Sequence, residues 1–128
     1  MEYYISKDLV ISPIQPEDCR AFADGFAAQG WHKPQSQYEG YLKEQQEGTR
    51  QVLAARWKGE AAGYLTLLPE ATAGPFAGKG WPEIVDFNVL EKFQRKGIGS
   101  RLMDCAEAEA VKTSRIVSLG VGQHSGYR

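Results

Sequence analysis

The segment that most restricts the fold is Glu83–Ala110, because it joins a strand, a glycine-containing turn and a helix without interruption. "EIVDFNVL" (Glu83–Leu90) is rich in β-branched and aromatic residues, which predicts a strand. Beyond the turn, a helix is predicted, because one set of residues recurs at helical spacing: Ile98, Leu102, Cys105, Ala106 and Glu109. "RIVSLGV" (Arg115–Val121) predicts a second strand, so the unit is βαβ and its right-handed crossover makes the two strands parallel.

The preceding half of the chain supplies the other elements. "LVISPI" (Leu9–Ile14) predicts a strand, a helix begins at Pro16 and ends near Gly30, and a weaker helix covers Gln35–Glu47. Two extended runs around Lys58-Gly59-Glu60 predict a hairpin, and the proline- and glycine-rich Pro69–Pro82 predicts a loop. The predicted order is β-α-α-β-β-β-α-β, an α/β fold with a mixed sheet in a single domain over residues 1–128.

Composition excludes several classes of protein. A net charge of −1 over 128 residues argues against a nucleic-acid binder, which is normally clearly basic. No apolar run reaches the roughly 20 residues of a membrane span, and the start resembles no signal peptide, so we expect a cytoplasmic protein without a membrane partner. Cys19 and Cys105 are then expected as free thiols, and no metal site is predicted because the ligand spacing is absent.

The glycine turn has the features of an anion site. A helix start exposes unpaired N–H groups and the positive end of the dipole, and Arg95 and Lys96 add charge there. A P-loop is excluded because "GPFAGKG" is one residue short and lacks the hydroxyl. A dinucleotide fingerprint is excluded because Leu102 takes the place of the third glycine and no acid follows at the required distance.

The loop "QRKGIG" (Gln94–Gly99) resembles the Q/R-x-x-G-x-G/A loop of the GNAT superfamily of acyl-CoA-dependent N-acetyltransferases. The strand before it and the helix after it follow in the order of that family, and the N-terminal half is similar as well. The resemblance therefore covers essentially the whole chain, although its specific motif is confined to Glu83–Ala110. It implies the acyl-CoA N-acyltransferase-like fold, with acetyl-CoA as acyl donor.

The resemblance also implies a set of cofactor-binding residues. The end of the strand would run alongside the pantetheine, and the backbone N–H groups of the loop would hold the pyrophosphate. The thioester would lie between Val89 and the segment near Leu119–Gly120. The residues implied are Phe87, Asn88, Val89, Gln94, Arg95, Lys96, Gly97, Ile98, Gly99 and Ser100. The alternative for Arg95 and Lys96 is a solvated role, and for the turn it is a tight loop that binds nothing.

Two carboxylates are candidates for the base that removes a proton from the acceptor amine, Glu83 and Asp86. Burial of an acid within an apolar strand is costly unless the acid is paired or lines a cleft. Strand alternation predicts that Asp86 shares a face with Ile84 and Asn88, and that Glu83 lies on the other face. The alternative for either residue is a capping or ion-paired carboxylate without a catalytic role.

These observations predict an enzyme that transfers an acetyl group from acetyl-CoA to a primary amine by direct attack. The acceptor, a small molecule or a peptide, is left open, and core packing competes with a pocket role for the aromatic residues. Those residues are Trp31, Trp57, Trp81, Tyr38 and Tyr41. The alternatives are a non-catalytic CoA-binding or interaction domain, or a mixed-sheet domain without a CoA site.

The sequence departs from the family pattern after the last predicted strand. The family continues into a further helix and a pair of strands, and only a short segment ending in "HSGYR" (His124–Arg128) follows here. Tyr127 lies too early to be assigned as the acid that protonates the thiolate, and His124 is interpreted as a solvated residue. The sequence is then either part of a longer protein or a truncated gene product, and in either case the expected fold lacks the final helix and strand pair. An open sheet edge there would favour a homodimer.

Overall fold

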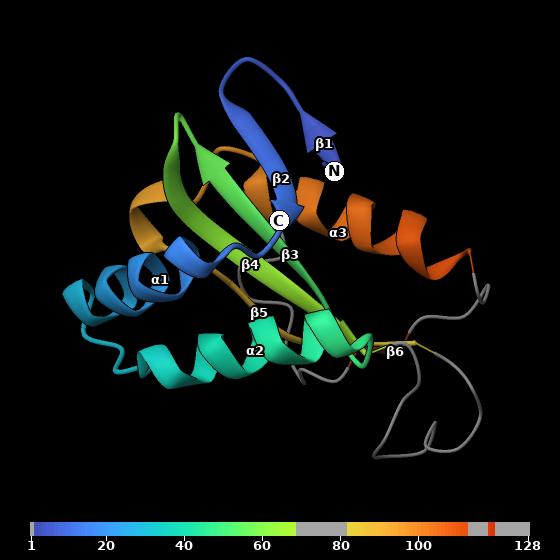
Figure 1. The fold of residues 1–128 in the computed structure, drawn as a ribbon. Coiled ribbons are helices and arrows are strands. Elements are labelled where there is room, and N and C mark those ends of the chain that lie inside the picture. Colours follow the sequence, from blue (N-terminus) through green and yellow to red (C-terminus); the bar gives the residue numbers. More distant parts are fainter. Residues whose placement is uncertain (1, 69–81, 113–117, 120–128) are drawn as a thin grey trace.

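The computed structural model describes residues 2–68, 82–112 and 118–119, which form one six-stranded sheet with helices on both faces (Figure 1). The strands are β1 (Tyr4–Ile5), β2 (Leu9–Pro13), β3 (Gln51–Trp57), β4 (Glu60–Leu68), β5 (Glu83–Val89) and β6 (Ser118–Leu119). The helices are α1 (Pro16–Ala28), α2 (Gln35–Glu47), the short 3₁₀ helix η2 (Glu91–Phe93) and α3 (Ile98–Ala110).

The predicted fold class is confirmed. The spatial order of the strands is their order in the chain, β1 to β5 are antiparallel, and β5 pairs with β6 in parallel, as a βαβ unit requires. The predicted elements are present, and β1 is an addition. The predicted loop Pro69–Pro82, apart from Pro82, lies outside the described residues, as do the ends of the last predicted strand, Trp81, Gly120, His124 and Tyr127. Over the described part of the chain, no helix is long and apolar enough to span a membrane.

Helix α1 is fixed at its start by a buried carboxylate. Pro16 occupies the first turn, and the Oδ2 atom of Asp18 accepts a hydrogen bond from the backbone N–H of Gln15 at 2.7 Å. The same carboxylate forms an ion pair with Arg56 of β3. The start of the helix is therefore attached to the sheet that it covers.

Helices α1 and α2 cover one face of the sheet and α3 covers the other (Figure 1). On the first face, Phe22 of α1 packs against Tyr38 of α2 and Tyr64 of β4, with ring centroids 5.5 and 5.2 Å away. All three side chains are fully buried. On the second face, Ile98 and Leu102 of α3 are buried against the sheet. The apolar side chains of α1 and α2 on one face and of α3 on the other thus form the two layers of the core.

Strand β5 contains a bulge at Asp86. Leu65 pairs with Phe87 and the next residue, Thr66, pairs with Val85, so Asp86 has no partner on β4. Its φ is 55°, in the left-handed region that Asp tolerates better than most residues. The bulge inserts an extra residue into the alternation of side chains along β5.

The bulge makes the predicted faces of Glu83 and Ile84 wrong, whereas Asp86 and Asn88 share a face as predicted. Glu83 is opposite Leu68 and Asn88 is opposite Tyr64, whereas Ile84 is opposite Leu67. Directly opposed residues point to the same face, so Glu83 and Asn88 lie on the α1–α2 face and Ile84 on the α3 face. Simple alternation placed Ile84 with Asn88 because it counted no extra residue between them.

Candidate active site

The N-terminus of α3 presents backbone N–H groups without a side-chain cap. Gly97 is the N-cap residue with φ of 80°, and no side chain caps the helix. The first helical hydrogen bond runs from the N–H of Arg101 to the carbonyl of Gly97 at 3.0 Å. The N–H groups of residues 98–100 precede that bond and point along the helix axis toward the loop. This end of the helix is suited to an anion.

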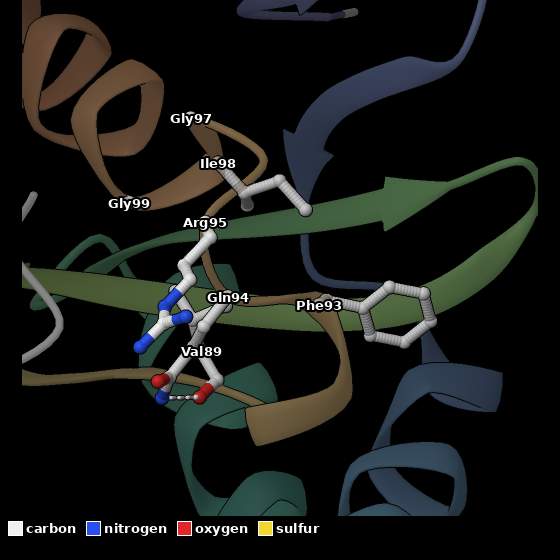
Figure 2. Close-up of a pocket in the computed structure, with 7 residues that line it drawn as sticks. All are labelled: Val89, Phe93, Gln94, Arg95, Gly97, Ile98 and Gly99. Carbon is white, nitrogen blue, oxygen red and sulfur yellow. Dashed lines mark hydrogen bonds between the residues drawn. The ribbon is translucent and has the colours of Figure 1, made fainter.

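A cavity of about 160 Å³ lies at this helix end (Figure 2). Its lining comes from the end of β5, from η2, from the loop and from the first turn of α3. The lining residues are Val89, Phe93, Gln94, Arg95, Gly97, Ile98 and Gly99. The structure thus brings together six of the ten predicted cofactor-binding residues, with Phe93 as an addition that the sequence analysis did not include.

The loop is held in place by its own backbone and by Gln94. The Nε2 atom of Gln94 donates a hydrogen bond to the carbonyl of Val89 at 3.1 Å, which ties the loop to the end of β5 (Figure 2). Arg95 has φ of 67°, a left-handed conformation, and its side chain extends to the same side of the loop as Gln94 (Figure 2). The guanidinium of Arg95 is exposed and available to an anion at the cavity.

The remaining predicted cofactor-binding residues differ in position. The Nζ atom of Lys96 lies 5.4 Å from the centroid of the Trp57 ring, so its charge is directed toward β3. Ser100 is exposed in the first turn of α3. Phe87 and Asn88 belong to β5 beyond the bulge and are half-buried.

The Asp86 carboxylate is the centre of a second polar cluster, on the α1–α2 face. Its Oδ2 atom accepts hydrogen bonds from the hydroxyls of Tyr41 at 2.5 Å and Tyr64 at 3.0 Å, and from Nε2 of Gln37 at 3.3 Å. Its Oδ1 atom accepts one from Nδ2 of Asn88 at 2.7 Å. We call these five side chains the Asp86 cluster. It connects α2, β4 and β5.

The tyrosine hydroxyls of this cluster keep their protons. Burial raises the pKa of Tyr64, and the negative charge of Asp86 raises it further. Burial also raises the pKa of Tyr41, as do its hydrogen bond to Asp86 and the charge of that residue. Both hydroxyls therefore act as donors to the carboxylate. Tyr64 and Gln37 were absent from the sequence-based candidates, although Tyr64 stands in the extended run "AAGYLTLL" that follows the predicted hairpin turn.

Glu83 lies at the start of β5, opposite Leu68 of β4 and Ser118 of β6. It is partly exposed. It shares the α1–α2 face with the Asp86 cluster, so the structure places both candidate bases on one side of the sheet.

The aromatic candidates divide between core and surface. Tyr38 is fully buried and donates a hydrogen bond to the hydroxyl of Tyr64 at 3.3 Å, and Trp31 is exposed and stacked on Phe26. Trp57 lies under Lys96, away from the Asp86 cluster. Among these, Tyr41 alone contacts a candidate base within the described residues.

Comparison with known proteins identifies the family. The model of the GNAT acetyltransferase family matches residues 17–126, which is most of the chain. The chain belongs to the GNAT acetyltransferase family. No curated protein sequence matches it. The resemblance of Gln94–Gly99 to the family's loop is thereby supported by a match that runs from the first turn of α1 past β6 and leaves out β1 and β2.

Solved structures share the fold of this GNAT protein. An acetyltransferase from Salmonella typhimurium, described as modifying the N-terminal serine of ribosomal protein L7/L12, is similar with a TM-score of 0.73 and 14% identity, covering 98% of this chain and 79% of the other. A GNAT family acetyltransferase from Staphylococcus aureus gives 0.70 and 16%, covering 94% and 92%. The protein yncA from Salmonella typhimurium, solved with its cofactor acetyl-CoA, gives 0.69 and 18%, covering 90% and 70%. At these identities the likeness establishes the fold.

The site of this GNAT protein shows no metal-binding geometry in the part of the chain that the structure describes: no three His, Cys, Asp or Glu side chains are grouped to hold an ion. Cys19 is buried, Cys105 is half-buried, and both are free thiols. Burial raises the pKa of each thiol, which lowers the reactive thiolate fraction. Neither cysteine lines the cavity at α3.

Proposed function

We propose that this protein transfers an acetyl group from acetyl-CoA to a primary amine by direct attack. The observation that carries the proposal is the cavity at the uncapped N-terminus of α3, at the end of a bulged β5 that bears two candidate bases. An anion-binding helix end, joined to a strand that carries carboxylates further along its length, is what an acyl-CoA donor and an amine acceptor require. Family membership supports the same reaction class.

The donor would be held mainly by backbone groups. The N–H groups of residues 98–100 face the position of the pyrophosphate, Gly97 leaves its Cβ position empty, and Arg95 supplies a positive charge. Nothing lies within 4 Å of a Cβ built on Gly97, so the space above it is open to a ligand. Lys96 would contribute long-range charge because its ammonium lies over Trp57.

The pantetheine arm would then follow β5 toward the bulge. Phe87, Asn88 and Val89 lie between the loop and Asp86, so the arm running back along them approaches the two carboxylates. A bulge re-aims the strand and interrupts its ladder, which leaves backbone groups available to a ligand. The reacting thioester would therefore lie near the α1–α2 face, where Glu83 and Asp86 are found.

The chemistry is proton transfer coupled to acyl transfer. A carboxylate, Glu83 or Asp86, takes one proton from the acceptor ammonium, and the free amine attacks the thioester carbonyl. The nitrogen–carbon bond forms and the carbon–sulfur bond breaks, and the departing CoA thiolate takes up the second proton, which the nitrogen loses as it becomes an amide. The raised thiol pKa values and their positions favour direct attack over a cysteine intermediate.

The acceptor is a primary amine on a small molecule or a peptide. The Salmonella typhimurium protein of similar fold is described as modifying the N-terminal serine of a ribosomal protein, so this fold accepts an α-amine of a polypeptide. A peptide N-terminus is therefore the first class of acceptor to test for this chain. Small amines form the second class.

The test begins with isothermal titration of the protein with acetyl-CoA, dephospho-CoA and pantetheine. Micromolar binding of the first two and loss of binding with pantetheine is the expected result, because only pantetheine lacks the pyrophosphate. Release of free CoA thiol with a panel of peptides and small amines then measures transfer. Binding without transfer to any amine would instead support a non-catalytic CoA-binding domain, and no binding would contradict the proposal.

A further inference from the structure

The Asp86 carboxylate is nearly saturated with hydrogen bonds. Of the roughly four acceptor positions of a carboxylate, Tyr41, Tyr64 and Gln37 crowd Oδ2, and Asn88 occupies one position on Oδ1. To bind a proton at Oδ2, Asp86 would have to break its 2.5 Å bond to Tyr41 or reverse that donor, and only one acceptor position remains, on Oδ1 beside Asn88. This arrangement suits an anchor better than a proton acceptor.

The anchor joins segments that are distant in the sequence. Tyr41 comes from the middle of α2, and Asp86 is the residue that bulges out of β5 with φ of 55°. A non-glycine residue in the left-handed region is strained, and it persists where its surroundings hold it. The bonds from Tyr41, Tyr64 and Asn88 are the contacts that hold this one.

A second link fixes the residue before the bulge. The Oγ1 atom of Thr66 donates to the carbonyl of Val85, and Nη1 of Arg50 donates to that same Oγ1 at 2.9 Å. The Arg50 guanidinium also lies 4.5 Å from the centroid of the Tyr41 ring. The carbonyl before the bulge and the carboxylate at the bulge are thus connected through Arg50 and Tyr41.

We propose that Asp86 is a positioning residue, which fastens the bulge of β5 to Tyr41 of α2 and so sets the backbone of Phe87–Val89 against the pantetheine arm. Glu83, which is partly exposed on the same face, is then the carboxylate left to accept the proton. The inference rests on the proposed function for its ligand. The link between Tyr41, Asp86 and the backbone beyond the bulge is a property of the free protein.

The test compares Tyr41→Phe and Asp86→Asn with Tyr3→Phe as the matched control. Tyr3 also has a hydrogen-bonded hydroxyl, which accepts from Gln51 at 3.4 Å, but it lies outside the Asp86 cluster. Hydrogen exchange of the free proteins is measured first, at the backbone amides from Phe87 to Leu90. Exchange there is expected to be at least about tenfold faster in Tyr41→Phe and Asp86→Asn, and unchanged in Tyr3→Phe. Equal protection in all four proteins would overturn the inference.

The second readout is the affinity and pH profile of the reaction. Loss of one hydrogen bond to a charged group predicts about a tenfold increase in Kd for acetyl-CoA in Tyr41→Phe. The acidic limb of kcat/KM is expected to stay at the parent's pH. If Asp86 were the base, removing the Tyr41 donor would move that limb to higher pH, because the donor stabilises the charged form. Such a shift, or an unchanged Kd, would contradict the positioning role.

The two proposals fail in different ways. A parent protein that binds no acetyl-CoA contradicts the proposed function, while hydrogen exchange still tests whether Tyr41 and Asp86 order Phe87–Val89. A parent that binds and transfers, with variants that bind equally well, leaves the function in place and overturns the positioning role. Tyr41→Phe is a mild change, and a thermal unfolding curve for each variant verifies that it is folded.

Discussion

Substitution of Gly63 by alanine tests whether β4 and β5 are packed as closely as the structure shows. A Cβ built on Gly63 would lie 2.8 Å from the carbonyl oxygen of Asn88, 3.0 Å from Cα of Val89 and 3.1 Å from its Cγ2. Two of these three atoms belong to the backbone of β5, so no change of rotamer relieves the contact. The strand must move, at the residues proposed to accompany the pantetheine.

The size of the effect follows from two opposing contributions. Overpacking of this kind destabilises the folded state by about 1–3 kcal/mol. Alanine also reduces the conformational freedom of the unfolded chain, which stabilises the protein by about 0.4–1 kcal/mol. We expect Gly63→Ala to lower the free energy of unfolding by about 1–2 kcal/mol. For a chain of this length, 1 kcal/mol corresponds to about 4 °C in Tm, so the expected decrease is about 4–8 °C.

Gly40→Ala is the matched control. Gly40 lies inside α2, is exposed, and has nothing within 4 Å of its Cβ position. The same substitution there is expected to stabilise the protein by about 0.5–1 kcal/mol, because alanine is the better helix former. Thermal unfolding and titration with acetyl-CoA are measured for both variants. A Tm of Gly63→Ala equal to or above that of the parent would refute the close approach of β5.

Three further predictions concern the loop, the base and the core. Gly97→Ala is expected to weaken acetyl-CoA binding more than Gly48→Ala. Both variants are expected to lose about 1–2 kcal/mol of stability, because φ is 80° at Gly97 and 83° at Gly48. Equal titration curves for the two variants would show that the turn holds no ligand. Glu83→Gln should lower kcat at neutral pH by about 100-fold or more with Kd for acetyl-CoA unchanged, and full turnover would eliminate it as base. Phe22 is fully buried, so Phe22→Ala should lower the free energy of unfolding, measured in urea, by about 3–5 kcal/mol. A decrease of less than about 1 kcal/mol would contradict this packing.

The sequence predicted those parts of the structure that depend on neighbours in the chain. The turn and helix of α3 follow from glycine, charge and helical spacing within one segment, and the hairpin follows from Lys58 and Gly59, whose φ values are 51° and 85°. The strand β1 was missed because it has only two residues, too few to show a pattern. The confirmed elements are those in which a local signal and the tertiary fold agree.

The bulge at Asp86 could not be predicted, because the contacts that fix it are not local. Its carboxylate is bonded to Tyr41, 45 residues earlier, and to Tyr64, 22 residues earlier. Nothing in "EIVDFNVL" indicates that its fourth residue leaves the ladder, and without the bulge the faces of Glu83 and Ile84 are reversed. An Asp inside an apolar strand was nevertheless a signal, since such a residue needs partners to be tolerated.

The two halves of the candidate site therefore differ in how far they can be predicted from the sequence. The donor half is a loop and a helix end made of consecutive residues, and its anion chemistry can be derived from those residues alone. The half that carries the candidate bases is assembled from α2, β4 and β5, so each side chain acquires its role from tertiary contacts. Asp86 illustrates the consequence: its position in the sequence suggested a base, whereas its hydrogen bonds favour an anchor. Removal of the Tyr41 hydroxyl distinguishes these two roles. If Asp86 is a base, the pH profile of the reaction changes; if Asp86 is an anchor, the strand beside it becomes less ordered.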